Sequence, residues 1–137
     1  MRNFSSDQLI KEIAQSCKGL VYVSETDSPI EVYAEEDEKI DRAYKAAVEK
    51  EEKYHRKGSV EISRHDILFN RLTTEKDWQT TEQKRIVKKF RILRELLEAN
   101  LENLRMIRRG KVNIEIYVLG ADKENNVIGI KMRAVET

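Results

Sequence analysis

The sequence predicts a single mixed α/β domain, and three observations favour this fold class. The 137 residues are a length that one core can organise, burying about two-thirds of the unfolded surface. One long segment carries apolar residues at helical spacing, and a later segment alternates before a turn from which the chain runs back. Hydrophobic residues make up 39% and charged residues 37% of the chain, so we expect a modest core under a heavily charged surface.

The first predicted element is a helix that starts near Ser5. Ser5 and Gln8 stand at capping-box spacing, and apolar residues recur every three or four positions after them. Gly19 then stands where a residue of positive φ ends a helix. Cys17 is the only cysteine, which excludes an internal disulfide and indicates a reducing compartment. Because it lies on the apolar side of the helix, we interpret it as a core residue and not as a nucleophile.

Two strands are predicted next, over residues 20–24 and 30–34. The residues that join them, 24–29, are turn formers and include the only proline, so we expect a hairpin. Glu25 would lie at its tip. A loop glutamate is ordinarily a solvated charge, and from the residues alone that reading stays open.

Residues 36–57 form a highly charged segment for which two readings stay open. One is an amphipathic helix over about 38–54 with a thin apolar stripe, and the other is a mobile excursion. After it, residues 60–62 predict a short strand. Residues 63–72 predict a short helix with Ser63 as its N-cap.

The strongest periodic signal follows residues 73–78, which predict a linker or a helical turn. Thr80 and Gln83 again stand at capping-box spacing, and we expect a long helix after them. Its apolar residues recur at intervals of 4, 3, 4, 4 and 3, and they are Ile86, Phe90, Leu93, Leu97, Leu101 and Leu104.

The end of the chain predicts two antiparallel strands. Residues 112–119 alternate in side-chain character, residues 120–126 are turn formers, and residues 127–135 run back. The free α-carboxylate of Thr137 would then lie at the end of a strand, where a terminus is more ordered than usual.

Catalytic chemistry has little support in the sequence. His55 and His65 are the only histidines, and no Cys/His spacing indicates a zinc site. No phosphate-binding loop, nucleophile elbow or metalloprotease motif is present. Among 25 acidic residues, chance pairs of carboxylates carry little information. We therefore predict no enzyme, no catalytic residue, no cofactor and no metal of its own.

The net charge of +1 hides an uneven distribution along the chain. Residues 25–52 contain 11 acidic and 4 basic residues, a net −7, whereas residues 53–137 contain 19 basic and 12 acidic residues, a net +7. A charged binding face and an ordinary solvated surface are both compatible with this pattern.

The long helix allows an alternative function, a nucleic-acid-binding or general protein-interaction module. Basic residues occupy its first half and also follow its end: Lys84, Arg85, Lys88, Lys89, Arg91, Arg94, Arg105, Arg108, Arg109 and Lys111. Such charges could bind phosphates. However, no exposed aromatic residues lie among them for base stacking, so a solvated helix face is favoured.

We expect a cytoplasmic protein that does not cross a membrane. Nothing in the chain approaches an apolar run of about 18 residues. The start, Met1 to Ser6, lacks the apolar core of a secretory signal.

Several segments resemble the nuclease A inhibitor family. Residues 19–33 (GLVYVSETDSPIEVY) are similar to its first hairpin, and residues 69–78 (FNRLTTEKDW) to the segment before its long helix. The similarity continues through GKV at 110–112 and YVLG at 117–120 to VET at 135–137. It covers nearly the whole chain except about residues 36–57, and it rests on the order and spacing of the segments.

The resemblance implies a fold and a partner. The fold would be a three-layer α-β-α sandwich with a largely antiparallel central sheet, formed by residues 1–137 as one nuclease-inhibitor-like domain. The protein would block sugar-nonspecific, Mg²⁺-dependent nucleases of the ββα-metal type. It would be a monomer when free, and it would not bind nucleic acid directly.

The resemblance also implies the contact residues, which are Glu25, Thr26, Asp77, Trp78, Glu136 and Thr137. Carboxylate oxygens of Glu25 and Thr137 would reach the nuclease's metal, because Mg²⁺ accepts hard oxygen ligands. Trp78 would supply a large, rigid anchor of the kind that dominates binding energy at interfaces.

Overall fold

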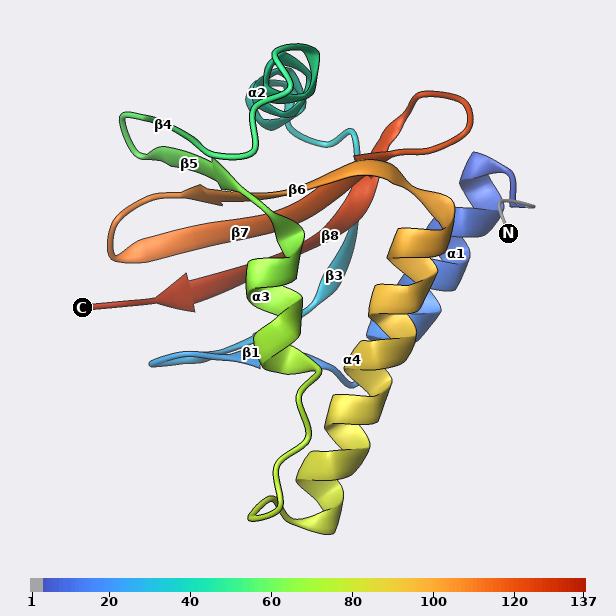
Figure 1. Ribbon diagram of the computed structural model, residues 1–137, viewed down its shortest axis with the longest axis vertical. Helices are drawn as coiled ribbons and strands as arrows, with labels where there is room; N and C mark the ends of the chain where they lie inside the picture. The colour runs from blue at the N-terminus through green and yellow to red at the C-terminus, as the bar shows by residue number, and fades with distance from the viewer. Residues whose placement is uncertain (1–3) are drawn as a thin grey trace.

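The computed structural model describes residues 4–137 (Figure 1). In chain order its elements are α1 (Ser6–Cys17), β1 (Val21–Val23), β2 (Asp27–Pro29), β3 (Glu31–Ala34), α2 (Glu38–Glu49), β4 (His55–Lys57), β5 (Val60–Ser63), α3 (His65–Leu72), α4 (Thr81–Asn100), β6 (Glu102–Arg109), β7 (Asn113–Ala121) and β8 (Val127–Val135). We expect no secretory signal at the start of the chain, and residues 1–3 of that start lie outside the described part.

The central sheet is antiparallel throughout and has six strands in the order β3-β8-β7-β6-β5-β4. The helix α2 covers one face, and α1, α3 and α4 cover the other (Figure 1). A separate pair, β1 and β2, lies beside the edge of this sheet. The α-β-α sandwich that the resemblance implies is therefore confirmed.

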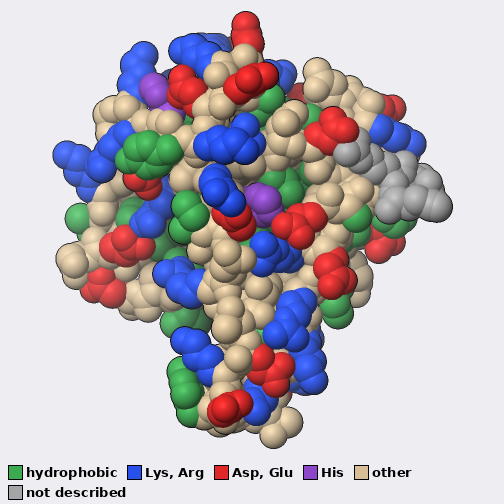
Figure 2. Space-filling view, in the orientation of Figure 1, with side chains coloured by type: hydrophobic (Ala, Val, Ile, Leu, Met, Phe, Trp, Pro, Cys, Tyr) green, Lys and Arg blue, Asp and Glu red, His purple; other side chains and the backbone are tan. Residues whose placement is uncertain are grey.

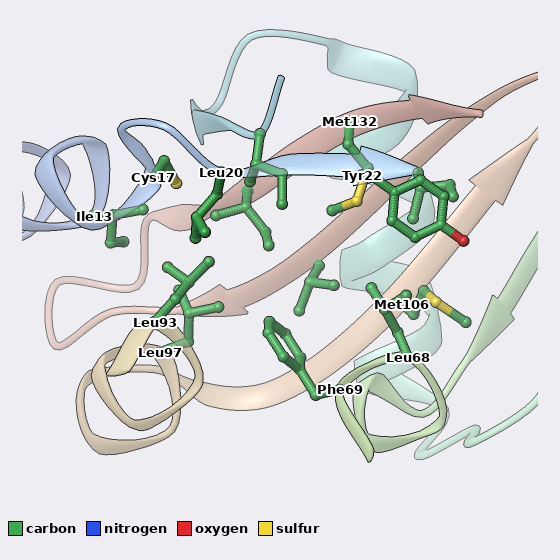
Figure 3. Packing of buried hydrophobic residues seen from close by; sticks show 14 of the residues in the cluster. Ile13, Cys17, Leu20, Tyr22, Leu68, Phe69, Leu93, Leu97, Met106 and Met132 are labelled. Carbon is green, nitrogen blue, oxygen red and sulfur yellow. The ribbon is translucent and has the colours of Figure 1, made fainter. Parts of the chain in front are cut away.

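Alternation along the strands supplies two cores, one on each face. On β7, Ile116 and Val118 point into the larger core, whereas Tyr117 and Leu119 point into the smaller core under α2. Figure 3 shows how three helices meet in the larger core. The side chains that it labels on those helices are Ile13, Cys17, Leu68, Phe69, Leu93 and Leu97.

The predicted starts of α1 and α4 are confirmed, as is the predicted end of α1. Ser5 accepts from the amide of Gln8, and Thr80 accepts from the amide of Gln83, with the reciprocal bond in each case. Gly19 has φ of +78° just after α1, as expected for a residue that ends a helix.

Cys17 is a buried core residue, as predicted, with 4% of its surface exposed. Burial raises the pKa of its thiol to about 12, because the apolar core disfavours the thiolate. A thiol in that state is a poor nucleophile at neutral pH.

The predicted pairing of residues 20–24 with 30–34 is wrong. The strand β1 pairs with β2, which lies inside the segment expected to be the loop, and β3 pairs with β8. The physical reason is burial, because a strand with apolar side chains on both faces gains most inside the sandwich. There Tyr33 is buried in one core, while Val32 packs against the other.

Residues 36–57 contain a helix and a strand and are not a mobile excursion. The helix α2 starts at the N-cap Asp37 and ends at Glu49, five residues earlier than the pattern indicated. Its buried side chains, Ile40, Tyr44 and Ala47, close the smaller core. The amphipathic-helix reading is therefore confirmed, with a shorter helix.

Two further boundaries differ from the prediction. The helix α3 has Arg64 as its N-cap because Ser63 still pairs with Met106 as the last residue of β5. The helix α4 ends at Asn100, and Leu104 belongs to β6, a strand that the sequence did not indicate. The register of β6 shifts between Glu102 and Arg105, and this bulge hides the two-residue alternation by which a strand is recognised.

Candidate functional site

The site begins at the turn of the β1–β2 hairpin, where Glu25 meets Thr137. The hydroxyl of Thr137 donates to Oε1 of Glu25 at 2.7 Å, and its amide donates to Oε2 at 2.5 Å. The two residues are 112 positions apart in the chain, and both are exposed. The structure thus joins the two oxygen-bearing residues that the resemblance singled out.

These two hydrogen bonds set the charge state of Glu25. They lower the pKa of its carboxyl below the ordinary value, because hydrogen bonds donated to the ionised form stabilise it. The exposed tip therefore carries a full negative charge at neutral pH.

Two residues beside this pair, Glu136 and Thr26, differ in the contacts that they already make. The carboxylate of Glu136 accepts from Nη2 of Arg108 at 2.7 Å and is occupied in an ion pair. The backbone carbonyl of Thr26 accepts from the amide of Ser24 at 3.0 Å inside the turn, and Thr26 is exposed. Of the two, Thr26 is the more open to a partner.

Asp77 and Trp78 lie in the loop between α3 and α4, away from the Glu25–Thr137 pair. In Figure 1 the hairpin and the C-terminus project to the left, whereas this loop projects downward. Trp78 is 72% exposed, and Nζ of Lys76 lies 5.4 Å from its ring centroid. So large an exposed aromatic ring on a loop is a feature of binding surfaces more than of folding.

An open groove of about 590 Å³ runs from the pair toward the helices that flank this loop. Its lining includes Val21 and Val23 of β1, Leu72 of α3 and Ile86 of α4. Val23 is 69% exposed and Val21 is 41% exposed. Neither valine was predicted as a surface residue of the site. The unbroken apolar run that contains them was a signal, because successive side chains of a strand point to opposite sides and a hairpin on the surface buries only one side.

The groove side of the hairpin is also tied to α3. Nη2 of Arg71 donates to the phenolic oxygen of Tyr22 at 2.6 Å, and its guanidinium lies 5.9 Å from the centre of that ring. Tyr22 is buried between Val21 and Val23, so the two exposed valines are held by a fixed strand.

A sequence model described as nuclease A inhibitor-like protein matches residues 7–137. The chain belongs to the nuclease A inhibitor-like family. The match includes the hairpin, the loop with Trp78 and the C-terminus, and it also spans residues 36–57, where we saw no resemblance. A search of curated proteins finds no match to the chain.

Membership of the nuclease A inhibitor-like family implies a nuclease-inhibitor role and fits a protein that is not an enzyme. Within residues 4–137, no group of three or more His, Cys, Asp or Glu is arranged to hold a metal ion. His55 pairs with Glu52 at 2.9 Å, and His65 pairs with Glu98 at 2.8 Å, so each histidine has a carboxylate partner.

Two other features of this family member bear on its partners. No helix within the described residues is long and apolar enough to cross a membrane. On α4, the arginines of the basic stretch lie close to carboxylates: Arg85 pairs with Glu82, and Arg94 pairs with Glu98. Less free positive charge therefore remains for phosphates than the sequence indicated.

Proposed function

We propose that the chain is a single inhibitor domain that blocks the active site of a sugar-nonspecific, Mg²⁺-dependent nuclease of the ββα-metal type. Family membership supports the inhibitor role. The observation that favours this site is the hydrogen-bonded pair of Glu25 and Thr137 at an exposed tip.

The pair offers the oxygen atoms that such a mechanism needs. Each oxygen of Glu25 uses one lone pair for Thr137, which leaves a second lone pair for another ligand. The hydroxyl oxygen of Thr137 lies beside them, 2.7 Å from Oε1 of Glu25. Because Mg²⁺ prefers hard oxygen ligands, a carboxylate here would take the position that a phosphate oxygen of the nucleic acid occupies.

A second projection supplies the remaining contacts. Trp78 would be the anchor and Asp77 its polar neighbour, while Thr26 and Glu136 would flank the metal-directed tip. The groove that contains Val21 and Val23 begins at this tip. A rigid aromatic anchor surrounded by less important contacts is the usual distribution of energy in a protein interface.

In this proposal the nuclease, and not nucleic acid, is the partner of a monomeric, cytoplasmic protein without catalytic activity of its own. The ion pairs along α4 support this assignment, since they oppose phosphate binding by the same arginines.

The experiment compares two exposed aromatic residues. Trp78→Ala should weaken inhibition of a purified ββα-metal nuclease by about 2 kcal/mol or more, roughly thirtyfold in affinity. Tyr54→Ala is the matched control, because Tyr54 is 61% exposed and follows α2 on the other side of the sandwich. Equal inhibition by wild type and Trp78→Ala, or no inhibition by wild type, would contradict the proposal.

A further inference from the structure

The edge of the C-terminal strand β8 changes partner along its length. The strand β3 pairs with β8 only as far as Lys131, which lies opposite Glu31. Beyond that point the amides of Arg133, Val135 and Thr137 face the same side and have no β3 residue opposite them. An unpaired strand edge needs other acceptors if its amides are not exposed to water.

Side chains of the β1–β2 hairpin supply these acceptors. Oγ of Ser28 accepts from the amide of Arg133 at 2.9 Å, and Oγ of Ser24 accepts from the amide of Val135 at 3.0 Å. The carboxylate of Glu25 continues the row by accepting from the amide of Thr137. Three side chains of one hairpin therefore replace the missing strand along three alternate amides.

The two serines also connect this row to the shape of the turn. Oγ of Ser24 donates to the carbonyl of Thr26 at 3.0 Å, and Oγ of Ser28 donates to the carbonyl of Pro29 at 3.3 Å. A hydroxyl can donate and accept at once, whereas a methyl group can do neither. Each serine thus fixes the hairpin backbone and the β8 backbone through one oxygen.

We infer that Ser24 and Ser28 are positioning residues for inhibition, which hold Glu25 beside Thr137 by fixing the hairpin on the edge of β8, where the amide of Glu25 also donates to the carbonyl of Val135 at 3.3 Å. The inference rests on the proposed function. Neither serine needs to touch the nuclease, because Ser28 is only 7% exposed and the Ser24 hydroxyl is directed at β8. The serines affect binding by placing Glu25 and Thr137, the two residues that would contact the nuclease.

The first test uses the free protein. In Ser24→Ala, amide hydrogen exchange of Val135 should become roughly tenfold faster because its acceptor is lost, and exchange of Thr137 should rise with it. Ser24→Thr keeps a hydroxyl and should restore slow exchange. The amide of Glu136 is an internal control, since it donates to Val112 at 2.9 Å on the β7 side and should not change.

The second test measures inhibition of a ββα-metal nuclease by the same variants. Ser24→Ala should lose roughly tenfold in affinity, and Ser24→Thr should recover most of it. Ser59→Ala is the matched control, because Ser59 is an exposed serine between β4 and β5, at the opposite edge of the sheet. Ser28→Ala serves as a second variant once its circular dichroism shows that it folds.

The outcomes separate this inference from the proposed function. Unchanged exchange of Val135 in Ser24→Ala overturns the positioning role. Faster exchange with unchanged inhibition also overturns it, although the proposed function then stands. If the wild-type protein does not inhibit the nuclease, the proposed function fails and the positioning role in inhibition fails with it, whatever the exchange rates are.

Discussion

Glu25 and Thr137 show how two exposed residues can fix each other's chemistry. The Thr137 hydroxyl and amide lower the pKa of the Glu25 carboxyl, so the pair is favoured while the carboxyl is ionised. A depressed pKa means that this stabilisation is present above the ordinary glutamate value of about 4.3. It is lost as the pH falls through the lowered value.

Replacing the hydroxyl of Thr137 tests this coupling directly. Thr137→Val keeps the shape and the amide but removes the side-chain donor, so the pKa of Glu25 should rise part of the way to its ordinary value. Thr137→Ser should keep it low. Carboxyl titration by NMR checks both variants, and an unchanged pKa in Thr137→Val would show that the hydrogen bond does not set it.

The sequence indicated Glu25 and Thr137 as contact residues but did not predict that they contact each other. Nothing in the spacing of Glu25 and Thr137 predicts a contact, because their meeting depends on where β3 begins on β8, with its first residue Glu31 opposite Lys131. The resemblance supplied both residues as contact candidates. Ser24 and Ser28 were read only as turn formers, since hydroxyls that accept from a distant strand leave no local pattern.

At the scale of elements, the sequence was most informative where one period is uninterrupted. Capping boxes and a long apolar stripe predicted α1 and α4, alternation predicted β7, and the turn after it predicted that β8 runs back. The strand β6 was missed because a bulge breaks its alternation, and Asn103 within the bulge has φ of +56°. Leu104 continued the helical spacing by coincidence, so the helix was predicted too long.

The helix α2 depends on contacts that its own sequence does not reveal. The hydroxyl of Tyr44 donates to the carbonyls of Asn103 and Glu102 in the bulge, at 2.9 Å and 3.2 Å, and Tyr44 is 2% exposed. A helix with a thin apolar stripe is stabilised mainly by such tertiary contacts. The bulge in β6 therefore provides the carbonyls through which α2 docks on the sheet.

Tyr44→Phe should lower the free energy of unfolding by about 1 kcal/mol, because the carbonyls of Asn103 and Glu102 lose the hydroxyl of a buried side chain as donor. Tyr54→Phe is the matched control, since its hydroxyl meets Glu61 at 3.2 Å on the surface and should cost much less. Urea unfolding monitored by circular dichroism measures both. Equal costs for the two variants would contradict the docking of α2 through Tyr44.

At the scale of the whole molecule, ion pairs join the acidic segment of the sequence to its basic part. Residues of the acidic segment pair with the basic part, as Asp37 does with Arg109 at 2.8 Å and Glu36 with Lys131 at 2.5 Å. Figure 2 shows acidic and basic side chains interspersed over the visible face. These pairs therefore reduce the charge asymmetry that the linear sequence indicated.

This mixing predicts weak binding of the free protein to nucleic acid. At physiological salt, a 20-base-pair DNA duplex should bind no tighter than the roughly 10⁻⁶ M edge of non-specific affinity. Fluorescence anisotropy with labelled DNA measures this, and a repeat at low salt shows how much of the binding is electrostatic. Specific binding with a dissociation constant well below that value would favour the alternative role of the basic helix.

The central claim is that oxygens at the Glu25–Thr137 tip block a nuclease. An extension after Thr137 crowds the tip, because Thr137 contacts Glu25 there, whereas the same extension before residue 1 is attached far along the chain from it. The most direct measurement compares the inhibition constants of these two forms against one ββα-metal nuclease. The account predicts that the C-terminal extension weakens inhibition by at least roughly tenfold, while the N-terminal extension has no effect. Equal inhibition by both forms would contradict a role for the Glu25–Thr137 tip in blocking the nuclease.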